Sequence, residues 1–84
     1  MNLFFDEIKA KIRESLNPEK LVLIDNSHLH SKHKSFDKNK FHLKIIIKSK
    51  KLKNMEKIKS HKLILSILKN EINNKIHALE IVVE

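Results

Sequence analysis

Hydrophobic residues recur along residues 3–16 at the spacing of an amphipathic helix, with charged residues on the opposite side. The Asn17-Pro18 pair predicts the end of this helix, because the residue before a proline is disfavoured in the helical region. The apolar stripe consists of Phe4 or Phe5, Ile8, Ile12 and Leu16.

Two later segments have strand patterns. Residues 21–25 form a short apolar run closed by Asn26 and Ser27. Residues 41–49 alternate between apolar and polar positions, which predicts a strand in a sheet with one covered face. The covered side is expected to carry Leu43, Ile45 and Ile47, and the exposed side His42, Lys44 and Lys48. The polar stretch 26–40 between the strands predicts a long loop.

The rest of the chain predicts a connection, a helix and a strand. Residues 50–60 are a basic connection with room for a short helical turn, and residues 61–72 are amphipathic with helical spacing. We expect Asn73 and Asn74 to close this helix in a left-handed conformation. The apolar, β-rich residues 76–83 then predict a last strand. The expected fold is α+β, one domain over residues 1–84, with helices on one face of a three-stranded sheet. The inward positions of the second helix are Ile64 or Leu65, Leu68 and Ile72.

Length and composition limit the functions that this chain can have. A chain of 84 residues buries only about 60–65% of its unfolded surface, so there is no room for a large internal active site. The absence of cysteine excludes disulfides, a thiol nucleophile and thiolate metal ligands. With no cysteine, no glycine and no pair of acids in a likely cleft, no catalytic constellation is recognisable, and we expect a non-enzyme. The N-terminus lacks signal and transit features, and no apolar run is long enough to cross a membrane, which predicts a cytoplasmic protein.

Positive charge is concentrated in the middle of the chain. Residues 32–62 carry twelve basic and two acidic side chains, a charge of +10, whereas the whole chain has a formal net charge of +8. Such a segment attracts phosphate backbones and favours nucleic-acid binding. The composition, rich in Lys, Ile and Asn, is equally typical of drift toward AT-rich codons, which would place lysines on a solvated face. The candidate phosphate contacts are Lys50, Lys51, Lys53, Lys57, Lys59 and Lys62.

Histidines provide the candidate metal ligands. Three of them, His28, His30 and His33, lie in the predicted loop and could bind a metal if other residues completed its coordination, or belong to a solvated loop. His61, at the predicted start of the second helix, is interpreted as a capping or packing residue. His42 is expected to be an ordinary exposed residue.

His77 stands at the predicted start of an apolar strand, where a polar and titratable side chain is unexpected. Three interpretations are open: a pH switch, a metal ligand, or a residue packed under the sheet whose ring nitrogens have partners.

Two segments resemble motifs of one known family. The segment LVLIDNSHLHSKH, residues 21–33, resembles the family's strand-then-loop pattern D-x-S-x-x-H. The segment FHLKIIIKS, residues 41–49, resembles the strand S-H-F-K-V-x-(V/I)-V-S. The matching residues are Asp25, Ser27 and His30, with His33 near a second loop histidine, and then His42 and Ser49.

Two further motifs follow in the family's order. In residues 59–72, His61 and Lys62 match the His and the second Arg of an R-H-R helix start. IHAL, residues 76–79, is nearly a fingerprint of the family. With four motifs in the correct order and spacing, the chain resembles BolA-like proteins over almost its whole length.

This resemblance implies a fold, a partner and a cofactor. The fold is α-β-β-α-α-β, similar to class II KH domains without their Gly-x-x-Gly loop. The partner is a monothiol glutaredoxin, and the two proteins share a bridged 2Fe-2S cluster to which the glutaredoxin side contributes a cysteine and a glutathione thiol. The BolA side contributes the IHAL histidine and a loop residue. The implied ligands are therefore His77 first and His30 second, with His33 as its substitute.

The expected function is that of an adaptor in iron-sulfur cluster sensing, trafficking or repair, monomeric when free. The alternative is a DNA-binding transcriptional regulator that acts through residues 32–62, since some BolA relatives are described as regulators.

Overall fold

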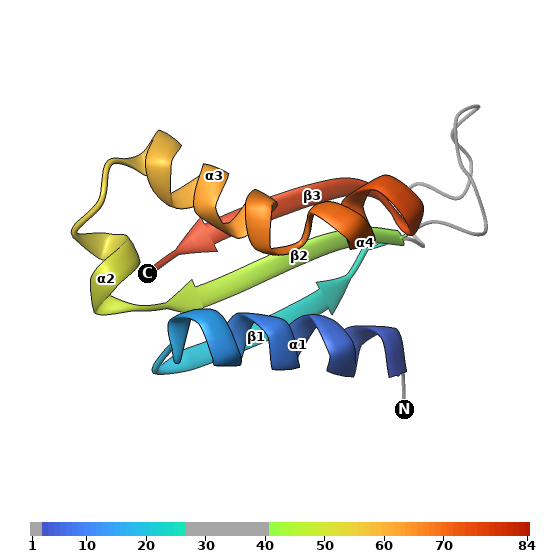
Figure 1. Ribbon diagram of the computed structural model, residues 1–84, viewed down its shortest axis with the longest axis horizontal. Coiled ribbons are helices and arrows are strands. Elements are labelled where there is room, and N and C mark those ends of the chain that lie inside the picture. Colours follow the sequence, from blue (N-terminus) through green and yellow to red (C-terminus); the bar gives the residue numbers. More distant parts are fainter. Residues whose placement is uncertain (1–2, 27–40) are drawn as a thin grey trace.

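A computed structural model describes residues 3–26 and 41–84 of the chain (Figure 1). Helix α1 spans Leu3–Leu16 and buries Phe4, Ile8 and Ile12, as the apolar stripe predicts. It ends at Asn17, whose N–H donates to the Arg13 carbonyl at 2.9 Å and whose φ of 43° lies in the left-handed region. Among the described residues, Asn17 is the only non-glycine residue with a positive φ, so the left-handed ending expected at Asn73 and Asn74 is wrong.

Three strands form one mixed sheet in the order β1-β2-β3. Strand β1 (Lys20–Asp25) is antiparallel to β2 (Phe41–Lys48), and β2 is parallel to β3 (Ile76–Val83). Because β2 and β3 run in the same direction, their first residues lie at one end of the sheet and their last residues at the other (Figure 1). We call the end with His42 and His77 the histidine end, and the opposite end the groove end.

The connection between β2 and β3 contains more helix than the sequence pattern predicts. Helix α2 (Lys50–Lys53) is the short turn expected there; its N-cap Ser49 accepts a hydrogen bond from the Leu52 N–H at 3.4 Å. Helix α3 (Lys57–Ile67) begins four residues before the predicted start, and a break at Leu68 separates it from α4 (Lys69–Asn74).

Ser60 explains why the sequence pattern places the start of this helix too late. It is buried, and its hydroxyl donates to the Lys57 carbonyl at 2.9 Å, so a polar residue occupies the inward side of the first turn. The apolar period in the sequence therefore starts only after the helix has begun. Ile64 and Leu68 are buried as predicted, whereas Leu65 is exposed.

The helices cover one face of the sheet, and the core lies between the two layers (Figure 1). The predicted inward residues of β2 are all buried, and the Phe4 and Phe41 rings stack with their centroids 5.2 Å apart. The predicted α+β fold with a one-sided sheet is confirmed. The buried apolar residues are Phe4, Ile8, Ile12, Leu43, Ile45, Ile47, Leu52, Ile64, Leu68 and Ile76.

Two ion pairs join residues that lie sixty or more positions apart in the sequence. Lys11 of α1 pairs with Glu71 of α4, whose carboxylate is buried. Lys20 of β1 pairs with Glu84 at 3.1 Å, and both of these side chains are solvent-accessible. Within the described part of the chain, no helix is long and apolar enough to cross a membrane.

Candidate functional site

His77 occupies an irregularity in the sheet. The parallel pairing aligns Phe41 with Ile76 but the next residue, His42, with Ala78, so that His77 is an extra residue on β3. Such a bulge is rare in parallel pairs, and bulges change the direction of a side chain relative to the regular strand. His77 is exposed, which overturns the interpretation that it is packed under the sheet.

His42 lies against His77, with ring centroids 5.0 Å apart and ring planes at 42°. Its side chain is on the outer face of β2, as the alternation predicts, but only 7% of it is exposed. The expectation that His42 is an exposed, ordinary residue is therefore wrong. The bulge sets two residues of β3 opposite this one residue of β2, and the imidazole of His77 lies against the ring of His42.

Both ends of the segment that carries His30 and His33 are attached at the histidine end. The N–H of Asn26 donates to the His42 carbonyl at 2.8 Å, and the N–H of Phe41 donates to the Lys75 carbonyl at 2.8 Å. His28, His30 and His33 themselves lie outside the described residues.

The described residues of the histidine end do not by themselves form a complete set of metal ligands. Among residues 3–26 and 41–84, no group of three or more His, Cys, Asp or Glu side chains is close enough to hold a metal. An exposed imidazole is nevertheless a suitable ligand for one iron of a 2Fe-2S unit whose other ligands come from elsewhere. The exposed imidazole of His77 fits this role.

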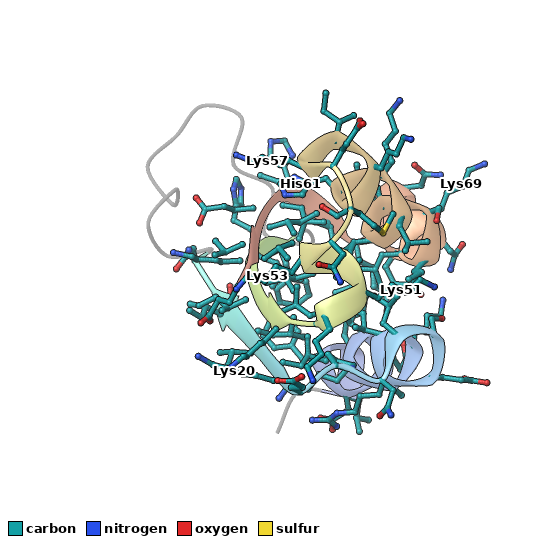
Figure 2. The ribbon with its side chains drawn as sticks, turned by 90° about the vertical axis from the view of Figure 1, so that its left-hand side faces the viewer. Lys20, Lys51, Lys53, Lys57, His61 and Lys69 are labelled. Atoms are coloured by element: carbon teal, nitrogen blue, oxygen red, sulfur yellow. The ribbon has the colours of Figure 1, made fainter. Side chains whose placement is uncertain are left out.

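The candidate phosphate contacts lie at the groove end. All six lysines are exposed on α2 and α3, but only Lys53 and Lys57 line a groove of about 440 Å³ between these helices and the end of β3. Figure 2 looks onto this end and shows Lys53, Lys57 and His61 on one side of α2 and α3, with Lys51 on the other side. His61 lies in the second turn of α3 and not at its start, and it lines the same groove.

Pattern analysis alone did not detect the contact of His42 with His77 or the apolar lining of the groove. The signal for the first was the family strand motif, in which a histidine stands at the position of His42. The apolar lining of the groove combines residues of α2 with Ile81 and Val83, about thirty positions later in the sequence, and no local pattern predicts it.

Comparison with known proteins identifies the class to which this α+β chain belongs. A family model described as BolA-like protein matches residues 12–84. A BolA-like protein of Dictyostelium discoideum is 40% identical over 77 residues, covering 90% of this chain and 65% of that protein. The DNA-binding transcriptional regulator BolA of Haemophilus influenzae is 35% identical over 72 residues, covering 86% of this chain and 67% of that protein.

The fold agrees with this assignment. The BolA domain of SufE1 from Arabidopsis thaliana matches the structure with a TM-score of 0.85 at 28% identity, over 100% of this chain and 93% of that one. The chain therefore belongs to the BolA family.

Proposed function

We propose that this BolA-family protein is an adaptor that binds a monothiol glutaredoxin and shares a bridged 2Fe-2S cluster with it. The observation that carries the proposal is the bulge at His77. There one imidazole is exposed at the edge of the sheet, beside a buried second imidazole, at the end where the histidine-rich segment 27–40 begins and finishes. A chain without cysteine has imidazole as its natural ligand for iron.

In this proposal His77 is the first ligand and His30 the second, with His33 as substitute. An imidazole in place of a thiolate raises the potential of a 2Fe-2S cluster and makes its ligation sensitive to pH. His42 is a positioning residue, because its ring packs against that of His77 and limits the orientations that the ligand can adopt. The glutaredoxin contributes its cysteine and a glutathione thiol.

The test is anaerobic reconstitution of the cluster on a monothiol glutaredoxin with glutathione, followed by titration with this protein. We expect visible absorption and circular dichroism to change up to one equivalent of wild type and to stay constant with His77→Ala. His61→Ala, at the groove end, is the matched control and should behave as wild type. A wild-type titration that leaves the spectrum of the glutaredoxin homodimer unchanged would sink the adaptor proposal.

A second candidate function is binding to DNA as a transcriptional regulator. It is favoured by the exposure of all six candidate lysines on α2 and α3 and by the name of the Haemophilus influenzae relative. Charge alone would give an affinity that falls steeply with salt and differs little between sequences. Regulation requires discrimination between duplexes at physiological salt. Equal affinity for unrelated duplexes would reject this candidate, and the slope against salt should fall by about one for each lysine removed from a phosphate contact.

A further inference from the structure

We propose that the groove between α2, the first turns of α3 and the end of β3 docks a short peptide segment of a protein partner, one that carries both carboxylates and aliphatic side chains. This surface lies at the end of the sheet opposite to His77, and the proposal does not depend on cluster binding.

The walls of the groove are aliphatic. Leu52 of α2 and Met55 of the following turn face Ile81 and Val83 of β3 across it. Leu52 is fully buried and anchors α2 to the core, whereas Met55, Ile81 and Val83 remain partly accessible. A volume of about 440 Å³ lies in the range of pockets that enclose a ligand, so the groove can receive apolar side chains and bury them.

The rim of the groove is positive. Lys53 and Lys57 are exposed, and within the described part of the chain neither has an ion-pair partner. Glu84 also lines the groove, but its carboxylate is paired with Lys20 at 3.1 Å. The half-buried His61 supplies a further nitrogen.

The start of α3 adds to this field. The residue before the helix, Glu56, makes no side-chain capping hydrogen bond to the first-turn amides, one of which belongs to the groove residue Lys57. Two unpaired ammonium groups beside a helix N-terminus complement carboxylates on an incoming segment.

The lining favours a peptide over a nucleic acid. Single-stranded nucleic acid is held on basic surfaces by stacking of its bases on aromatic rings. The lining of this groove contains no Phe, and its one ring is the imidazole of His61, so it lacks the successive rings on which several bases stack. The phenylalanines of the described chain, Phe4, Phe5 and Phe41, pack on one another toward the histidine end. Aliphatic walls with a cationic rim instead match alternating aliphatic and acidic side chains.

The experiment selects peptides from a display library of random twelve-residue sequences on the full-length protein. Enriched sequences are synthesised, and their affinity is measured for wild type and for Lys53→Glu/Lys57→Glu. The matched control is Lys62→Glu/Lys69→Glu, which changes the net charge by the same amount at exposed residues outside the groove. Amide NMR spectra verify that both variants are folded and locate the bound peptide.

We expect enriched peptides to combine Asp or Glu with Leu, Ile or Val and to shift the amides of residues 52–61 and 81–84. The groove variant should weaken binding by about tenfold or more, and the control by less than about twofold. His77→Ala should bind the peptide as wild type does. Equal weakening in the two charge variants, enrichment without acidic residues, or no enrichment would overturn the proposal. So would tighter binding of a thymidine oligonucleotide that is lost only in the groove variant, since the ligand would then be a nucleic acid.

Discussion

The two ends of the parallel pair β2 and β3 differ in how they expose their chemistry. At the histidine end, a bulge in the strand backbone lifts one imidazole out of the regular ladder and sets it over another. At the groove end, the strands are regular and the helices α2 and α3 supply the lysines and the cavity. Strands of eight residues at about 3.3 Å per residue hold these two surfaces on the order of 20–25 Å apart. The fold thus separates the proposed ligand site from the proposed docking surface by most of the length of the sheet.

We expect the largest effect on stability from a residue in the middle of β2, between the two ends of the sheet. Ile45, in the middle of β2, is fully buried, and Ile45→Ala should lower the free energy of unfolding by about 2–5 kcal/mol. Ile58→Ala is the control, because Ile58 is 67% exposed and should change stability by about 0.5 kcal/mol or less. Urea denaturation measures both. Equal effects of the two substitutions would contradict the assigned core.

The ion pairs Lys11–Glu71 and Lys20–Glu84 should differ in their contribution to stability, with the more buried pair contributing more. Lys11→Ala leaves the buried carboxylate of Glu71 without its cation, and α4, which leads into the histidine end, loses its tie to α1. We expect a loss of about 1–3 kcal/mol in the free energy of unfolding. Lys20→Ala breaks the accessible pair with Glu84 and should cost about 0–1 kcal/mol. If Lys20→Ala lowered the free energy of unfolding more than Lys11→Ala does, burial would not determine which of these ion pairs contributes more to stability.

A smaller and local effect is expected at the cap of α2. Ser49→Ala removes the acceptor for the Leu52 N–H and should destabilise the protein by about 0.5–1 kcal/mol, near the lower end for caps because the bond is long at 3.4 Å. Hydrogen exchange should accelerate at Leu52 and Lys53, while amides near His42 and His77 keep their wild-type rates. Acceleration at both ends would mean that the two surfaces are not independent.

Elements with a strong local pattern were predictable from sequence. The stripe of α1 and the alternation of β2 are each generated by contact with a single apolar layer, so period and structure agree. The start of α3 was not predictable, because its inward residue Ser60 is polar and its hydroxyl donates a hydrogen bond to the Lys57 carbonyl. Nor was the break at Leu68, a buried leucine that continues the apolar period of the helix.

The candidate site depended on pairing between distant residues. His77 could be selected by its resemblance to the family motif, but its position beside His42 follows from the register of β3 on β2, which local sequence does not encode. The contact between His42 and His77 has the same origin, since the two residues lie thirty-five positions apart in the sequence.

The measurement that tests the central claim most directly is pulsed EPR of the reduced cluster in the complex with a monothiol glutaredoxin, with isotope-labelled histidine in this chain only. We predict hyperfine coupling between the cluster and imidazole nitrogen of this chain. The coupling should be weaker in His77→Ala and unchanged in His61→Ala. Coupling that persists unaltered in a folded His77→Ala protein, or no coupling to histidine of this chain at all, would contradict it.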